Sequence, residues 1–159
     1  MKFFVRNKVA SIGGSSRVYD ENNNDIFKVK GKVFSITRKK KIYDMDGKLL
    51  YIVKNKFWNF WTRSSFVLDA NKHKIARVKS RAFKSGFDIL GYGDQIAIDG
   101  FTLGGYKIIV NSEQVGSVKS NILSLADNFE VEINDGQDPA FIVSLIIAID
   151  NVRDKLKQA

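Results

Sequence analysis

Three neighbouring stretches of the chain repeat one pattern of apolar and polar positions. They span residues 18–32, 42–56 and 67–81. Counted from the first residue of each stretch, Asp stands at +2, an aliphatic residue at +8, Val at +11, Lys at +12 and Lys or Arg at +14. A shorter fourth copy covers residues 109–121. Each copy predicts a β-hairpin, because a polar turn rich in Asp, Asn and Gly leads into a strand that alternates apolar and basic residues.

Further strand-like runs lie between and after the repeats, at residues 33–37, 57–62, 87–90, 95–98 and 129–133. The repeats begin too close together for helical crossovers, so we expect consecutive strands to pair as an antiparallel meander. Roughly ten to twelve strands in one small domain would splay as an open sheet with exposed edges. The pattern therefore predicts a mainly β protein, a closed antiparallel barrel of about twelve strands.

The C-terminal part of the chain changes from the strand period to a continuous apolar run. Asp138 and Pro139 are typical of a helix start, since Asp caps the first amides and Pro has no N–H to lose at the first helical position. Residues 140–149 have no polar face, so a helix there must be buried on all sides. An apolar stretch of about 11 residues is too short to span a bilayer. We expect a central helix at about 139–157, inside the barrel.

The composition is that of a globular protein and removes several kinds of chemistry. The 159 residues are most simply one domain covering residues 1–159, with 44% apolar and 27% charged side chains. The absence of Cys excludes thiolate catalysis, zinc-thiolate sites and disulfides. Arg6 interrupts the N-terminal apolar run before a signal-peptide core develops, and no apolar run reaches the length of a membrane span. We therefore expect a soluble cytoplasmic protein.

The hairpins and the C-terminal helix together resemble one known family. The segments that carry the resemblance are 43–54 (YDMDGKLLYIVK), 87–91 (FDILG) and 138–150 (DPAFIVSLIIAID), in this order. From about residue 18 to residue 153 the chain resembles the LURP-one-related family, tubby C-terminal-like proteins that also look related to phospholipid scramblases. The resemblance implies a barrel of about twelve strands around a central helix, and it implies no chemistry. Tubby holds a phosphoinositide head group with basic side chains, but the resemblance assigns none of those positions to residues of this sequence.

Catalytic, metal and cofactor chemistry find little support in the sequence. His73 is the only imidazole, and it stands in a polar turn between Lys72 and Lys74, where an exposed side chain is expected. The acidic stretches 20–25 and 44–47 fail the EF-hand pattern and suit turns instead. Neither the glycines at 13–14 nor those at 91–93 match a nucleotide-binding loop. We expect no catalytic residue, no metal and no cofactor.

Charge is distributed unevenly, with a net charge of +14 over residues 1–90 and −5 over residues 91–159. In each repeat, the basic positions +12 and +14 lie on the face opposite the Val at +11, so they should point out of the barrel. Six cations would then form an array that could bind anions, namely Lys30, Lys32, Lys54, Lys56, Lys79 and Arg81. The run Arg38, Lys39, Lys40 and Lys41 would add charge nearby. The alternative is a merely solvated exterior.

Three functions remain open at this point. The first is a non-enzymatic module whose basic exterior recognises an anionic membrane surface, such as phosphoinositide or other acidic lipid head groups. The second is nucleic-acid binding by the same face together with Trp58 or Trp61 of the aromatic run 57–61, although packing explains these aromatics more simply. The third is a scaffold with a protein partner only. An enzyme acting on a ligand inside the barrel is disfavoured, because the helix would fill that space.

Overall fold

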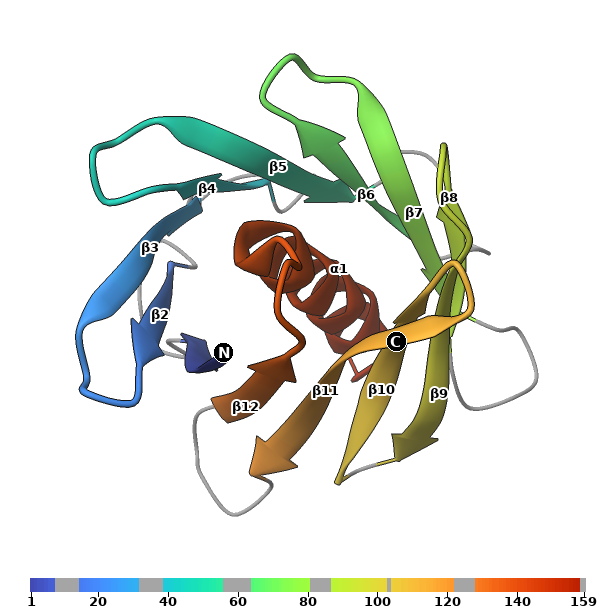
Figure 1. Cartoon of the computed structure of the whole chain (residues 1–159). Helices are drawn as coiled ribbons and strands as arrows, with labels where there is room; N and C mark the ends of the chain where they lie inside the picture. Colours follow the sequence, from blue (N-terminus) through green and yellow to red (C-terminus); the bar gives the residue numbers. More distant parts are fainter. Residues whose placement is uncertain are drawn as a thin grey trace.

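The computed structural model contains twelve strands and one long helix (Figure 1). It describes residues 1–7, 15–31, 39–55, 64–80, 87–102, 104–121 and 128–157. The strands are β1 (Lys2–Asn7), β2 (Ser16–Asp20), β3 (Asp25–Gly31), β4 (Lys40–Tyr43), β5 (Leu49–Asn55), β6 (Ser64–Asp69), β7 (Lys74–Ser80), β8 (Phe87–Gly91), β9 (Ile96–Thr102), β10 (Gly105–Val110), β11 (Glu113–Asn121) and β12 (Asn128–Ile133). The helix is α1 (Pro139–Lys157).

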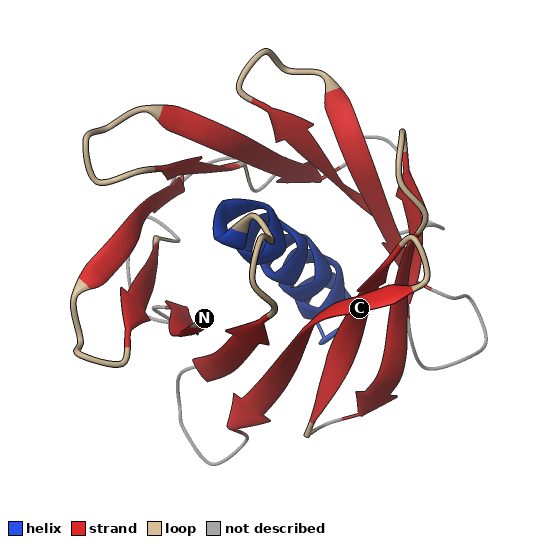
Figure 2. Ribbon diagram, viewed as in Figure 1, coloured by secondary structure: helices blue, strands red, loops and turns tan. Residues whose placement is uncertain are grey.

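All strand pairs are antiparallel, and the twelve strands form one sheet that curls almost into a closed barrel. The order β8-β7-β6-β5-β4-β3-β2-β1-β12-β11-β10-β9 leaves β8 and β9 at the two ends of the sheet. In Figure 2 the strands surround the helix. The expected antiparallel barrel around a C-terminal helix is therefore confirmed, with a seam between β8 and β9.

Strand β1 was not among the strands that the sequence predicted. It joins the two halves of the sheet, because it pairs with β2 on one side and with β12 on the other. Phe3 and Val5 face the core and are fully buried. They occupy only two alternating positions at the chain terminus, and their strand partner β12 is more than a hundred residues away. Local alternation over so short a run carries little signal without the long-range pairing.

The repeated Asp at +2 builds the same turn in three hairpins. Asp20, Asp44 and Asp69 each accept a hydrogen bond at Oδ1 from the backbone N–H four residues later, at 2.8 Å in each case. Three residues after each Asp the backbone has positive φ, at Asn23 (66°), Gly47 (92°) and Lys72 (70°). The three repeated segments therefore form the same type of turn. In each turn the Asp carboxylate accepts hydrogen bonds from backbone N–H groups that would otherwise have no partner within the turn.

The aliphatic residue at +8 of each repeat marks a β-bulge. The register shifts next to Ile26, Leu50 and Ile75, so that each of them has no partner directly opposite on the neighbouring strand. All three pack against the core. The bulge restores the register that places Val at +11 inward, and Val29, Val53 and Val78 are buried accordingly.

Helix α1 begins and lies as the sequence predicts. Asp138 Oδ1 accepts hydrogen bonds from the N–H groups of Ala140 and Phe141, at 2.9 and 3.2 Å, which is the geometry of an N-cap. Tyr51 of β5 donates a hydrogen bond to Asp138 Oδ2 at 2.6 Å, so the start of the helix is tied to the sheet. Residues 142–152 are buried without interruption. Among the described residues, no helix is both long and apolar enough to cross a membrane.

Candidate anion-binding surface

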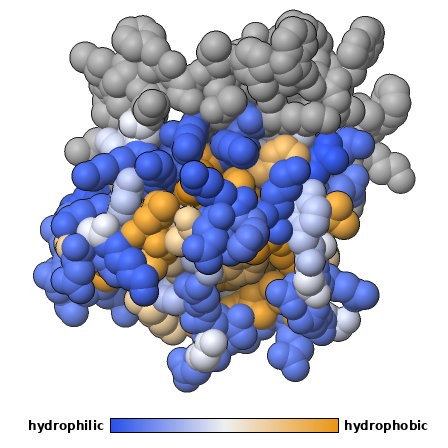
Figure 3. Space-filling view, turned by 90° about the horizontal axis from the view of Figure 1, so that it is seen from above, coloured by the Kyte–Doolittle hydropathy of each residue, from blue (hydrophilic) through white to orange (hydrophobic). Residues whose placement is uncertain are grey.

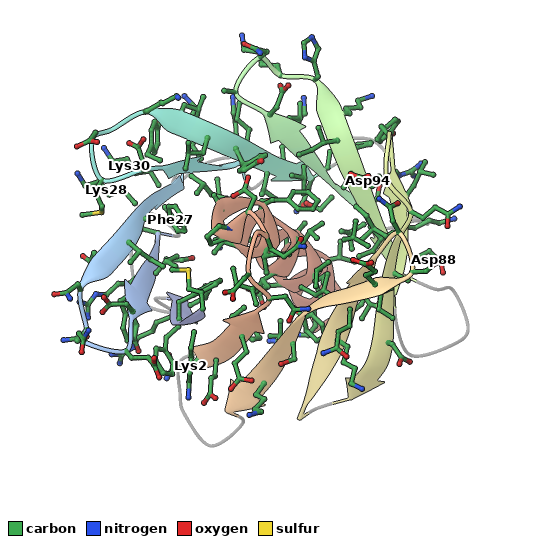
Figure 4. The ribbon with its side chains drawn as sticks, viewed as in Figure 1. Lys2, Phe27, Lys28, Lys30, Asp88 and Asp94 are labelled. Carbon is green, nitrogen blue, oxygen red and sulfur yellow. The ribbon has the colours of Figure 1, made fainter. Side chains whose placement is uncertain are left out.

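The outer face of the sheet from β3 to β7 carries a concentration of positive charge. Hydrophilic side chains cover much of the face seen in Figure 3, with apolar ones visible between them. The side chains at +12 of the repeats, Lys30, Lys54 and Lys79, alternate with the buried valines at +11 and so point outward. Figure 4 shows Lys28 and Lys30 outside β3, while Phe27 lies on the inner side.

Strand pairing brings further cations beside these three lysines. Lys41 of β4 lies directly opposite Lys30. Lys74 and Arg77 of β7 lie opposite Leu68 and Phe66 of β6. We call the set of seven outward cations the basic wall. It consists of Lys28, Lys30, Lys41, Lys54, Lys74, Arg77 and Lys79.

Two other basic residues expected at this surface, Lys39 and Lys40, are placed differently. Lys40 stands two residues before the buried Ile42 in β4, so its side chain lies on the same, inward side of the strand. Lys39 directly precedes that strand. Strand alternation therefore separates Lys40 from the neighbouring Lys41. Four more of the expected cations lie outside the described residues, namely Lys32, Arg38, Lys56 and Arg81. The aromatic run 57–61 also lies outside them.

Three members of the basic wall were missed by the sequence analysis. Lys28 and Arg77 stand at +10 of their repeats, two residues before the lysine at +12, and the same alternation could have found them. Lys74 could not be found in this way. Lys74 points outward because Ile75 is an extra residue in a β-bulge, which reverses the inward and outward alternation of β7 on its N-terminal side.

The cations of the basic wall have no acidic partners. None of the seven forms an ion pair with a carboxylate in the part of the chain that the structure describes. The wall formed by β1, β12 and β11 differs, because Lys2 contacts Glu130 at 3.0 Å and Lys119 lies 3.6 and 3.8 Å from Glu130 and Glu132. There the hydrogen bond to Glu130 raises the pKa of Lys2, and the same bond lowers the pKa of Glu130. Among the described residues, carboxylates thus pair with lysines on the wall of β1, β11 and β12, whereas no ion pair is formed by the cations of the basic wall, although Asp88 lies opposite Lys79 in the strand register.

Apolar side chains form the centre of the basic wall. Ile52 and Leu68 are directly paired across β5 and β6, and each is 3% exposed although it does not belong to the core cluster. Phe66 lies one row away, with Lys74 Nζ 4.9 Å and the Arg77 guanidinium carbon 5.6 Å from its ring centroid. The long aliphatic stems of the cations can cover such apolar groups while their charged ends stay in water. We call Ile52 and Leu68, which are buried, and Phe66, which is partly exposed, the apolar floor of the basic wall.

Arg77 keeps donor capacity in the middle of this surface. Its Nη2 lies 3.5 Å from Ser64 Oγ, a long hydrogen bond. Its Nε is buried and has no hydrogen-bond partner. A guanidinium has five N–H donors in a fixed plane that suits phosphate or carboxylate oxygens. Among the described residues, Arg77 therefore has one long hydrogen bond and a guanidinium whose donor capacity is not fully used.

Other candidate positions have structural roles. His73 is exposed in the β6–β7 turn, where its Nδ1 lies 3.1 Å from Asp69 Oδ2. The stretches 20–25 and 44–47 form hairpin turns, and among the described residues no group of three His, Asp or Glu side chains could hold a metal ion. Gly91 ends β8, and Gly93 lies in the turn that leads to β9.

An open hollow of about 500 Å³ lies at the ends of β1, β11 and β12. It is lined by both signs of charge, with the N-terminal residue and Lys2 beside Glu21 and Glu132. The N-terminal ammonium group already donates a hydrogen bond to the carbonyl of Ile133 at 2.9 Å. This hollow is therefore less suited to an anion than the basic wall is.

The fold defines the class of the protein. Twelve antiparallel strands wrapped around a buried C-terminal helix form a tubby-like barrel. The sequence model of the LURP-one-related proteins matches residues 1–150, and the chain belongs to this family. The match includes β1, which the resemblance noted from the sequence did not reach.

A solved structure shares the fold. It is the X-ray structure of a protein from Arabidopsis thaliana, with a TM-score of 0.65 and 21% sequence identity. The alignment covers 96% of this chain and 91% of the Arabidopsis chain. No curated protein matches the sequence significantly.

Proposed function

We propose that the protein is a non-enzymatic binding module that recognises anionic lipid head groups at a membrane surface through its basic wall. The observation that carries this proposal is that, among the described residues, seven cations on one side of the barrel form no ion pair with a carboxylate, whereas lysines on the other side do. Like charges held together cost free energy unless they serve a partner or lie fully in water. The cytoplasmic location expected from the sequence belongs to the same proposal, since anionic lipids concentrate on cytoplasmic leaflets.

The apolar floor favours a lipid surface over nucleic acid. A bilayer offers phosphate oxygens and hydrocarbon within a few ångströms of each other, and Phe66 lies among cations in the same way. Binding of single-stranded nucleic acid would use stacked aromatic rings beside the cations. The aromatics expected to serve that role, Trp58 and Trp61, lie outside the described residues, so no structural observation adds to the alternative.

Vesicle co-sedimentation of a charge-neutralised variant tests the proposal. The variant carries Lys30→Gln, Lys41→Gln, Lys54→Gln and Lys79→Gln, four members of the wall whose side chains make no hydrogen bond or ion pair among the described residues. Each cation near an anionic surface contributes about 1 kcal/mol, so partitioning into phosphatidylserine vesicles should fall by at least about tenfold. The dependence of binding on salt should become shallower as well, because fewer charges take part.

The matched control changes Lys107 and Lys119 to Gln on the opposite wall. Both lysines are exposed and the substitution is again Lys to Gln, although Lys119 also lies 3.6 and 3.8 Å from Glu130 and Glu132 and only two charges are removed. This variant should bind vesicles as the parent does. Equal loss in both variants, or no loss in the first, would contradict the proposal. Oligonucleotides serve as a second ligand, and preferential binding to them would favour the nucleic-acid alternative.

A further inference from the structure

Two large apolar side chains stand exposed next to the basic wall, on strand β8 and the turn that follows it. Leu90 is 55% exposed and Tyr92 is 50% exposed. Among the described residues, Met1 and Met45 are the other exposed large hydrophobic side chains, and Met45 lies in the β4–β5 turn at the far end of the basic wall, where its carbonyl accepts a hydrogen bond from Lys28 Nζ at 2.7 Å. Strand alternation directs Leu90 toward the outside of β8, and Tyr92 lies exposed in the turn that begins directly after that strand.

The strand register places this pair beside the cations. Leu90 lies directly opposite Arg77, which in turn lies opposite Phe66, and Phe66 lies opposite Lys54. One row across four strands therefore alternates charged and apolar groups and ends at Leu90. Tyr92 stays attached to the same wall through its N–H, which donates to the carbonyl of Ile75 at 3.1 Å.

The pair also lies at the seam of the barrel. Strand β8 is hydrogen-bonded to β7 and stands at one end of the twelve-stranded sheet. Figure 1 shows β8 at the right-hand side of the barrel, where the next strand along the chain, β9, belongs to the other end of the sheet. The two strands lie near each other without pairing as neighbours in the sheet, and Leu90 remains 55% exposed there. The apolar pair thus forms a ridge at the border of the wall.

We propose that Leu90 and Tyr92 insert into the interfacial layer of an anionic bilayer while Lys54, Arg77 and Lys79 contact the lipid phosphates. This inference rests on the proposed function and specifies which side chains move from water into the membrane. A Leu side chain gains from entering hydrocarbon, and a Tyr ring suits the interface, where its apolar body is buried and its hydroxyl stays wet.

Two carboxylates limit the depth of this insertion. Asp94 Oδ1 accepts a hydrogen bond from Asn111 Nδ2 at 2.9 Å, which holds it in the turn. Asp88 lies directly opposite Lys79, and Figure 4 shows it outside β8. Because carboxylates avoid hydrocarbon, only the ends of Leu90 and Tyr92 can enter it, and the rest of β8 stays at the level of the head groups.

Site-specific labelling tests the insertion directly, because the chain contains no Cys. Leu90→Cys provides a single attachment site for an environment-sensitive fluorophore. With vesicles of phosphatidylserine and phosphatidylcholine, its emission should shift to the blue and be quenched by lipids that carry a quencher in the acyl chain. The matched control is Lys119→Cys on the exposed outer side of β11, whose label should stay unchanged. Vesicles of phosphatidylcholine alone should shift neither label.

A second variant measures the contribution of the pair. Leu90→Ser with Tyr92→Ser should weaken vesicle binding by about ten- to a hundredfold, and the salt dependence should remain that of the parent, since no charge is lost. The four-lysine variant described above should instead flatten the salt dependence. Thermal unfolding should be nearly the same for the Ser variant and the parent, because both side chains are exposed.

The outcomes separate the insertion from the proposed function. If vesicles bind and the label at position 90 does not shift, the insertion is wrong and the anion-binding function stands. If vesicles do not bind the parent, both fail. A label that shifts with an oligonucleotide or an acidic protein but not with vesicles would also overturn the insertion.

Discussion

At the scale of single residues, neighbouring cations that face each other are the unusual feature of this barrel. Lys30 and Lys41 lie directly opposite on adjacent strands, and neither has a carboxylate partner among the described residues. Like charges at directly opposite positions destabilise a sheet. Lys30 finds partial compensation in the ring of Tyr43, 5.6 Å from its Nζ. Stability is therefore lowered locally where the surface is most suited to bind anions.

Replacing Lys41 by Met should stabilise the protein. Met keeps a long side chain over Ile52, its partner on β5, and removes the repulsion from Lys30. We expect the free energy of unfolding to rise by about 0.2–1 kcal/mol, measured by urea denaturation, while vesicle binding weakens.

The corresponding control is Lys119→Met. Lys119 lies near Glu130 and Glu132, so its removal should lower the free energy of unfolding. If both variants changed stability in the same direction, the repulsion between Lys30 and Lys41 would not be the cause.

At the scale of elements, the hairpin turn is the unit that the chain repeats. Each of its first three copies combines an Asp that accepts backbone hydrogen bonds, a residue with positive φ and a bulge that returns the second strand to register. Hydrogen bonds from Asn24 and Asn22 outweigh burial and lower the pKa of Asp20. At Asp69 burial acts to raise the pKa, but hydrogen bonds from His73 outweigh it, so the pKa is lowered there too.

These turns predict a defined loss of stability in acid. A carboxyl group whose pKa is lower in the folded than in the unfolded protein stabilises the fold above the unfolded value of about 3.9, and this contribution is lost as the pH falls through the folded value. Urea unfolding over a pH series should therefore show a decline that begins near pH 4 and continues below it. The double variant Asp20→Asn with Asp69→Asn keeps an acceptor oxygen in each turn, and its decline should be shallower.

Asp46→Asn is the control for this experiment. Asp46 lies in the exposed β4–β5 turn and accepts no hydrogen bond from the described residues. The variant should follow the parent at every pH. A parent-like decline in the double variant would show that other carboxylates cause the acid sensitivity.

At the scale of the whole molecule, the helix serves as the core of the barrel. Ile142, Leu145 and Ile146 are each no more than 1% exposed, and the strands supply the apolar side chains around them. The sheet has no second layer to pack against, so burial of its inner face depends on the helix. Sheet and helix must therefore fold together.

Ile146→Asp should unfold the protein. An unpaired charge at such a position costs several kcal/mol, which is a large part of the stability of a typical domain. Circular dichroism and the loss of a cooperative thermal transition would report the unfolding. Ile146→Val removes one methylene group and should cost only about 0.5–1.5 kcal/mol. A folded Ile146→Asp variant would show that the helix is not the core.

Local features of the sequence suffice for the hairpins, the helix and the outward direction of Lys30, Lys54 and Lys79. Strand alternation has a period of two residues, and the cap at Asp138 acts over one helical turn, so both are written in adjacent positions. The sequence also indicated that the strands form a barrel, since so many short antiparallel strands need closure. These local patterns do not specify a ligand.

The tertiary structure alone decided how distant segments meet. It placed β1 between β2 and β12, turned Lys74 outward through the bulge at Ile75, and set Leu90 beside Arg77 at the seam. It also showed that Glu130 pairs with Lys2, whereas among the described residues the cations of the basic wall form no ion pair with a carboxylate. Charge pairing, closure and burial depend on contacts between residues far apart in the chain, whereas the hydrophobic pattern records only which side of its own strand a residue faces.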